Sequence, residues 1–149
     1  MPQPEQWMQH ALELAARARA LDEVPVGSLV VLDDQIVGEG WNCPISTCDP
    51  TAHAEIIALR SAASRVGNYR LPGADLYVTL EPCIMCAGAI IHARIARVIF
   101  GARDPKGGAA GSVFNVLPTD RLNHAVTVSA GVMETECGTI LQQFFQAKR

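Results

Sequence analysis

The sequence predicts an α/β protein in which helices cover both faces of a mixed five-stranded sheet, a three-layer α/β/α arrangement. Strand-like apolar runs alternate with helical stretches along most of the chain, and strands separated by helices pair in parallel. The first two strand-like runs follow each other directly as a hairpin, which makes the sheet mixed. Hydrophobic residues make up 49% of the 149 residues but aromatic residues only 5%, so small aliphatic side chains must fill the core.

Residue spacing and turn residues predict the first helix and the hairpin. Residues 4–20 place Trp7, Met8, Leu12 and further apolar side chains close to helical spacing. The next two apolar runs flank Asp33-Asp34-Gln35, a polar turn. They therefore predict a hairpin, despite the glycines in its second arm.

Helix-start and turn residues delimit the elements that follow. Asp49-Pro50-Thr51 is a helix-start signal, and Gly67-Asn68 stops the helix that it opens. Pro82 ends a strand rich in β-branched residues, and a helix is expected from near Cys83. The segment RDPKGGAAGS (103–112) contains too much Gly and Pro for regular structure. The expected elements are helix 4–20, strands 27–32 and 36–41, helix 49–66, strand 75–80, helix 83–93, strands 97–102 and 125–129, and helix 133–147.

Length and composition favour one domain spanning residues 1–149, because two domains of this total length would each have a small core. No apolar run approaches the roughly 18 residues of a membrane span, and MPQPEQWMQH lacks the regions of a signal peptide. We therefore expect a cytoplasmic protein with no membrane partner. Five cysteines, an odd number without framework spacing, indicate metal ligands or buried thiols rather than disulfides.

The charge is distributed unevenly. Residues 1–59 hold 2 basic and 9 acidic side chains (net −7), whereas residues 60–149 hold 10 basic and 6 acidic ones (net +4). A basic second part could present positive charge on one face, although an uneven solvated surface explains the same numbers.

Two short segments carry chemistry that neither would carry alone. His53-Ala54-Glu55 opens one predicted helix, and Pro82-Cys83-Ile84-Met85-Cys86 opens another. Two cysteines three residues apart at a helix start can direct both sulfurs to one point, where the helix N-terminus favours thiolates. Two thiolates and an imidazole suit zinc. The sequence therefore predicts one Zn²⁺ per chain, held by His53, Cys83 and Cys86.

Three protein ligands leave one tetrahedral position for water, which is typical of catalytic zinc. Zinc lowers the pKa of that water toward about 7. Glu55 lies two residues after His53, where it can reach the water without binding the metal, so we predict that it shuttles protons. The spacing His-x-Glu followed by Pro-Cys-x-x-Cys is the signature of zinc deaminases that act on bases.

A structural zinc is the alternative, and it requires a fourth protein ligand. Candidates are present, but none has motif spacing to the other ligands. Cys137 is expected in the core, and the thiols that flank the loop at 43–48 are expected to be spectators. The candidates are Cys43, Cys48, Cys137, His10, His92 and His124.

At these residues the sequence resembles the bacterial tRNA-specific adenosine deaminases, which convert the wobble adenosine of a tRNA anticodon to inosine. The likeness covers most of the chain and is densest in DPTAHAEIIALR (49–60), LYVTLEPCIMCAGAIIHARI (76–95) and VIFGARDPKGGAAGS (98–112). It implies a cytidine-deaminase-like fold and hydrolytic attack at C6 of adenine. It also implies a homodimer and a tRNA anticodon stem-loop as the partner.

The resemblance further assigns substrate contacts. Asn42 would bind the target nucleoside, and Val26 and Ala54 would line the base pocket, Ala54 partly through its backbone. Asp104 and Lys106 would meet flanking nucleotides. Aromatic and basic side chains suit a loop with splayed bases. A core position on an amphipathic helix is the alternative for Phe145. The positions assigned to the anticodon loop are Arg70, Asn123 and Phe145.

Two other functions remain open on the sequence alone. Guanine and cytidine deaminases of nucleobase salvage share the His-Ala-Glu and Pro-Cys-x-x-Cys core, and for them the basic residues would be solvated surface. A non-catalytic, zinc-stabilised RNA-binding or scaffold protein is the other alternative. Glu55 argues against it, because a scaffold has no use for a carboxylate beside the metal.

Overall fold

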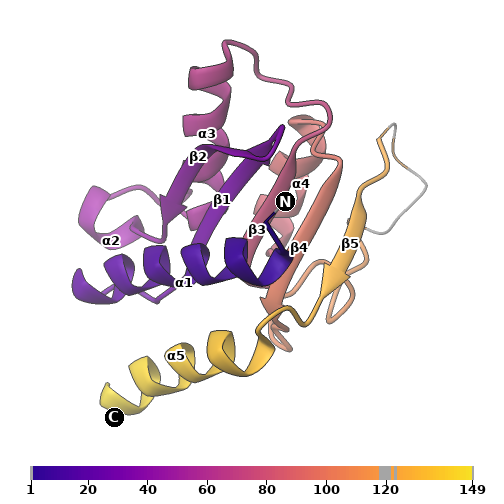
Figure 1. Ribbon diagram of the computed structural model, residues 1–149. Coiled ribbons are helices and arrows are strands. Elements are labelled where there is room, and N and C mark those ends of the chain that lie inside the picture. Colours follow the sequence, from indigo (N-terminus) through magenta and orange to yellow (C-terminus); the bar gives the residue numbers. More distant parts are fainter. Residues whose placement is uncertain (1, 118–121, 123, 149) are drawn as a thin grey trace.

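The computed structural model describes residues 2–117, 122 and 124–148 of the chain (Figure 1). Its helices and strands follow the predicted order with one insertion, the short helix α2. In sequence they are α1 (Pro4–Ala20), β1 (Gly27–Leu32), β2 (Gln35–Trp41), α2 (Pro44–Thr47), α3 (Ala54–Val66), β3 (Asp75–Leu80), α4 (Ile84–His92), β4 (Arg97–Ala102), β5 (Thr127–Ala130) and α5 (Glu134–Ala147).

The strands form one sheet in the order β2-β1-β3-β4-β5. β1 pairs antiparallel with both β2 and β3, whereas β3, β4 and β5 run parallel. The predicted mixed five-stranded sheet is therefore confirmed within the described residues. Because β3 and β4 are parallel, their carboxyl ends meet at the same edge of the sheet, next to the start of α4.

Helices cover both faces of the sheet, as the three-layer prediction requires (Figure 1). On one face α1 and α5 pack on a cluster that includes Met8, Leu29 and Cys137. On the other face α3 and α4 enclose a larger cluster that includes Leu76 and Phe100. Because both faces are covered, β1 is buried along almost its whole length. No helix among the described residues is both long and apolar enough to span a membrane.

The hairpin turn and the glycines of β2 explain the first two strands. Asp33 and Asp34 adopt left-handed φ angles of 53° and 58°, the conformation of a two-residue type I′ turn. A Cβ at Gly40 would lie 2.6 Å from Ala58 N and overlap the Ala54 carbonyl oxygen. The glycine thus lets the backbone of α3 lie directly on β2, which fixes the position of the helix start.

The structure corrects the sequence prediction in the segment before α3. The helix begins at Ala54 rather than at residues 49–51, and His53 is its N-cap residue with an extended ψ of 155°. Asp49 Oδ1 instead accepts hydrogen bonds from Thr51 N (2.9 Å) and Thr51 Oγ1 (2.7 Å). This side-chain turn competes with the helix and delays its start by about one turn. The helix α2, with Pro44 in its first turn, was not predicted.

Candidate active site

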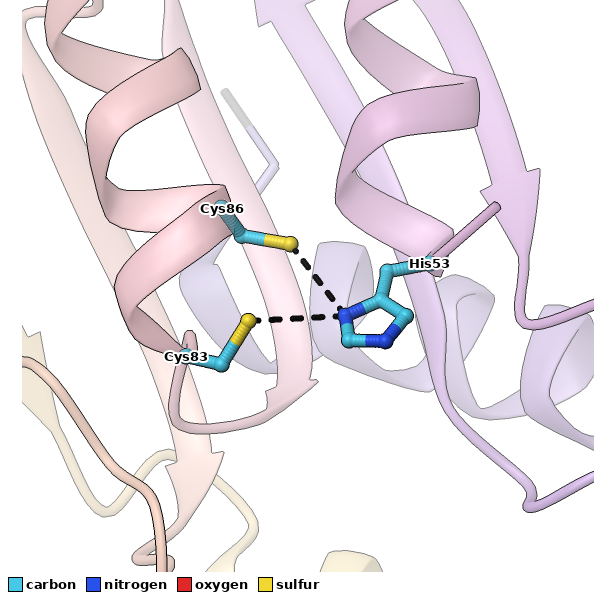
Figure 2. Close-up of side chains that lie close together, drawn as sticks. All are labelled: His53, Cys83 and Cys86. Carbon is cyan, nitrogen blue, oxygen red and sulfur yellow. Dashed lines mark hydrogen bonds between the residues drawn. The ribbon is translucent and has the colours of Figure 1, made fainter. Parts of the chain in front are cut away.

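The three predicted metal ligands converge between the starts of two helices (Figure 2). His53 is the N-cap of α3, Cys83 is the N-cap of α4, and Cys86 lies in the first turn of α4. Both sulfurs lie 3.5 Å from His53 Nδ1. All three donor atoms lie within 4.8 Å of one another.

This geometry fits zinc. Bonds of about 2.3 Å to sulfur and about 2.1 Å to nitrogen place the two donors roughly 3.6 Å apart at a tetrahedral angle, close to the 3.5 Å observed. Among the described residues, no fourth side chain of His, Cys, Asp or Glu joins the cluster. A structural site with four protein ligands is therefore not formed, and the donor set is that of an open, catalytic zinc site.

The electrostatic environment favours a thiolate at Cys83. The pKa of this thiol is lowered to about 4, because a hydrogen bond from Cys86 and another from His53 stabilise the charged sulfur more than partial burial destabilises it. The N-terminus of α4 adds its positive end. The hydrogen bond to Cys83 in turn raises the pKa of His53, despite the opposing effect of burial.

Glu55 lies beside this cluster in the first turn of α3 and is only 4% exposed. Burial raises its pKa to about 7, and the negative charge of Cys83 adds to that effect. Glu55 is not one of the three clustered donors. A carboxyl group of this acidity gains and loses a proton near neutral pH, as a general acid–base must.

A cavity of about 200 Å³ contains these groups. Glu55, His53 and Cys83 line it, and the predicted substrate residues Asn42 and Val26 line it as well. Its lining also includes Val24, Leu80, Glu81 and Asp104.

The Asn42 side chain is held in a fixed orientation in this cavity. It is almost fully buried, and its Nδ2 donates a hydrogen bond to the Val24 carbonyl oxygen at 3.2 Å. Ala54 is different, because its side chain is fully buried in the core under β2 and is not part of the cavity lining.

A second hollow of about 410 Å³ adjoins the cavity and shares Val24, Leu80 and Asp104 with it. Lys106 and Phe145, which were predicted to contact RNA, line it together. Phe145 is 48% exposed, so the core position considered for it is wrong, and its neighbour Phe144 is the buried residue.

One of the predicted RNA contacts, Arg70, does not join the site of its own chain. Arg70 lies in the loop after α3, with its guanidinium 5.3 Å from the ring centroid of Tyr69. It follows the far end of a 13-residue helix whose first turn holds Glu55, and such a helix is about 20 Å long. Asn123 lies outside the described residues.

Three functional candidates were not predicted from the sequence. Arg103 lines the second hollow. The buried carboxylate of Glu23 accepts hydrogen bonds from Ile45 and Ser46 of α2, and that of Glu81 accepts them from the loop of residues 103–112. Burial would raise the pKa of Glu81, but hydrogen bonds from Ser112 and from backbone N–H groups outweigh it and lower that pKa. The available signal for Glu81 was a carboxylate placed between a buried strand and the Cys83 ligand.

Comparison with known protein families decides the chemistry of this site. The family model of the cytidine and deoxycytidylate deaminase zinc-binding region matches residues 1–102. The chain belongs to this family. It is therefore a zinc-dependent deaminase, with one zinc per chain.

Relatives of this deaminase narrow the family further. A tRNA-specific adenosine deaminase of Haemophilus influenzae is 55% identical over 97% of this chain and 84% of that protein. One from Bacillus subtilis is 43% identical over the whole chain and 92% of that protein. The deaminase described here thus belongs to the tRNA-specific adenosine deaminase family, and the resemblance seen in the sequence is confirmed.

Solved structures agree with this assignment. A structure from work on A-to-I editing by tRNA:A34 deaminases at the wobble position is 47% identical to this deaminase, with a TM-score of 0.88 over 91% of this chain and 99% of that chain. A guanine deaminase from Nitrosomonas europaea has a TM-score of 0.79 at 24% identity, over 97% of this chain and 85% of that one. The second likeness supports the fold alone.

Proposed function

We propose that this chain hydrolytically deaminates the wobble adenosine of a tRNA anticodon loop to inosine, as one domain spanning residues 1–149 in the cytoplasm. One observation carries the proposal: the cavity that contains the metal donors and Glu55 adjoins a hollow lined by Lys106 and Phe145. Such an arrangement suits a base inserted beside the metal while the neighbouring nucleotides stay outside. Relatives named tRNA-specific adenosine deaminase support the choice of substrate.

Each polar residue of the cavity has a role in this reaction. His53, Cys83 and Cys86 would hold zinc, which when bound acts as a Lewis acid and makes water a nucleophile near neutral pH. Glu55 would accept one proton from the attacking water and deliver it to the ring nitrogen. It would then take a second proton, from the hydroxyl group added at C6, and deliver it to the amino group that leaves as ammonia. Burial keeps bulk water away from this carboxyl group.

Asn42 and Val26 would form the pocket for the target nucleoside. Because the Asn42 Nδ2 is already bonded to the Val24 carbonyl, the amide is oriented before the substrate arrives. Preorganised polar groups of this kind fix a ligand's orientation at little entropic cost. Ala54 could contribute only through its backbone, since its side chain is in the core.

The second hollow would receive nucleotides that flank the target. Phe145 offers an exposed aromatic face for stacking, and Arg103 and Lys106 offer positive charge for phosphates. Asp104 lies at the boundary between this hollow and the cavity, and it lines both.

We also propose a homodimer. A hollow of about 430 Å³ between α3 and α4 is lined mostly by apolar side chains, including Ile56, Leu59 and Ala89. Tyr69 beside it is 69% exposed. Arg70 follows Tyr69, far from the active site of its own chain, so it would reach bound RNA only across such an interface.

The test is a deamination assay on an adenosine-containing anticodon stem-loop, with free guanine and cytidine in parallel. We expect inosine in the RNA and no ammonia from the free compounds. Turnover of guanine or cytidine alone would leave the zinc chemistry in place and overturn the RNA assignments. RNA binding without release of ammonia would instead identify a scaffold.

A further inference from the structure

Glu81 occupies an unusual position between the sheet and the metal donors. It follows β3 directly, lies two residues before Cys83, and lines the cavity, yet it is only 2% exposed. A buried carboxylate is costly unless its oxygens accept hydrogen bonds. The partners of Glu81 therefore indicate what the residue does.

Among the residues that the structure describes, all of the hydrogen bonds that Glu81 accepts through its side chain come from the loop of residues 103–112, here called the GG loop after Gly107-Gly108. Oε1 accepts from Asp104 N at 3.0 Å and from the Ser112 hydroxyl. Oε2 accepts from Ala110 N at 3.0 Å and from Ser112 N at 3.1 Å. One carboxylate thus ties the start of the GG loop to its end.

The GG loop also packs on this carboxylate at a residue without a side chain. A Cβ at Gly108 would lie 2.5 Å from Glu81 Oε1 and would overlap the rest of the carboxyl group. The neighbouring Gly107 has no such constraint, since its Cβ would meet only Asp104 Oδ2 at 3.7 Å. The contact is therefore specific to one of the two adjacent glycines.

We propose that Glu81 is a positioning residue that fixes the GG loop, and through it Asp104 and Lys106, at the opening of the active site. The inference rests on the proposed function, because that function makes these two residues substrate contacts. The Asp104 backbone is held by Glu81, and the Asp104 Oδ1 in turn accepts hydrogen bonds from Lys106 N (3.0 Å) and Gly107 N (3.3 Å). By holding the backbone of Asp104, Glu81 thus also restricts the conformation of the loop at Lys106, the residue proposed to contact the substrate.

Other roles for Glu81 fit the structure less well. It is not a metal donor, because the three clustered donors converge without it. It is not placed to shuttle protons, because both of its oxygens already accept hydrogen bonds from the GG loop. Its acceptor-only chemistry matches a set of three N–H groups and one hydroxyl.

The experiment compares Glu81→Gln, Gly108→Ala and the matched control Gly107→Ala. Glu81→Gln keeps the shape but replaces one acceptor oxygen by an NH₂ donor that faces loop donors. Gly108→Ala keeps the carboxylate and displaces it. Zinc content, kcat and KM on the anticodon stem-loop, and amide hydrogen exchange of the GG loop are measured for each.

We expect Glu81→Gln and Gly108→Ala to raise KM for the stem-loop by about tenfold or more, since hydrogen bonds to charged groups are the stronger ones. Their kcat should stay within about threefold of wild type, and their zinc content should stay at about one per chain. Exchange at Asp104, Ala110 and Ser112 should accelerate by at least about tenfold. Gly107→Ala should match wild type. If Glu81→Gln does not fold, Gly108→Ala decides the question, because it retains the carboxylate.

Unchanged exchange in the GG loop in both variants would overturn the proposal. So would a loss of zinc or kcat at unchanged KM, which would place Glu81 with the metal chemistry. If the wild-type protein does not act on the RNA but exchange still accelerates, the anchoring of the loop stands and the proposed substrate fails.

Discussion

At the scale of single residues, the active site separates the groups that would hold the metal from Glu55, the group that we propose moves protons. The donors belong to two helix starts, whereas Glu55 points into the same cavity from the first turn of α3. Substitutions should therefore remove either the metal or the proton transfer.

Glu55→Gln should retain zinc and fold but lose turnover by about 10²–10⁴-fold, the usual contribution of a general acid–base. The measurement is inosine formation with metal analysis on the same sample. Glu13→Gln, an exposed position on α1, is the matched control and should keep full activity. Wild-type turnover by a zinc-loaded Glu55→Gln protein would contradict the assignment.

Cys83→Ala should reduce bound zinc from about one per chain to nearly none, because two donors hold the metal far less tightly than three. Elemental analysis after dialysis measures this. Cys48→Ala changes an exposed thiol outside the cluster and should keep its zinc. Full metal retention in Cys83→Ala would remove this residue from the ligand set.

Ionisation of Glu23 should make the free energy of unfolding depend on pH in the acidic range. Burial would raise its pKa, but hydrogen bonds from Ser46 and from the backbone of Ile45 outweigh it and lower the pKa below the ordinary value of 4.5, although the charge of Asp22 opposes them. Because the folded-state pKa is the lower one, the stabilisation is present above pH 4.5 and is lost as the pH falls through the folded-state value. The pKa of the nearby Cys43 thiol is raised, mainly by burial, so it stays neutral over this range.

Thermal unfolding of wild type and Glu23→Gln at a series of pH values measures this effect. We expect a lower Tm for Glu23→Gln at neutral pH and a difference that narrows below pH 4.5. A difference that is constant across the acid range would show that the ionised form of Glu23 does not contribute.

At the scale of elements, the start of α3 depends on the glycines of β2 that let the helix backbone approach. Sequence spacing predicted the helix, the hairpin and their order, because apolar periodicity reports which face is buried. It misplaced the first turn of α3, because the local bonds of Asp49 to Thr51 compete with the helix. It also missed α2, whose four residues are too few to show periodicity.

Gly40→Ala should therefore destabilise the protein and weaken zinc binding. The added Cβ pushes α3 away from the sheet at Ala54, one residue after His53, and overpacking of this kind costs about 1–3 kcal/mol. Gly138→Ala in α5 is the matched control, since a Cβ there meets nothing within 4 Å. It should raise the free energy of unfolding by up to about 1 kcal/mol. Chemical denaturation and zinc titration measure both variants.

Only some of the site residues could be predicted from the sequence. The metal donors and Glu55 form two short motifs at two helix starts, and the combined pattern of these motifs is typical of zinc deaminases, so the sequence could bring them together. Glu81 and Glu23 were not found, because their partners lie 20 or more residues away along the chain, in the loop of residues 103–112 and in α2, and no motif relates them to these partners. Arg70 was assigned by resemblance, which does not state how far it lies from its own chain's active site.

At the scale of the whole molecule, the basic part of the chain forms most of the second hollow. Arg103, Lys106 and Phe145 all fall within residues 60–149, which carry a net charge of +4. The acidic first part supplies α1, the hairpin, α2 and the start of α3. The excess of basic residues in the second part of the chain thus includes Arg103 and Lys106, the two cationic side chains of the second hollow.

The homodimer can be tested by the mass of the protein in solution. We expect twice the 16.0 kDa chain mass by light scattering. Ala89→Glu places a charge in the hollow between α3 and α4 and should give a monomer, because an unpaired buried charge opposes association. Ala16→Glu, at an exposed position of α1, should leave the dimer intact. A monomeric wild-type protein would contradict the proposed assembly.

The distribution of the site along the chain also sets an order of events during protein synthesis. The metal donors and Glu55 lie within residues 53–86, whereas the second hollow is complete only with Phe145 from α5. Synthesis proceeds from the N-terminus at about 5–20 residues per second, so more than fifty residues and several seconds separate the two. A growing chain therefore contains every metal donor several seconds before it contains all the residues of the proposed RNA surface, so zinc binding does not have to wait for the residues that contact the substrate.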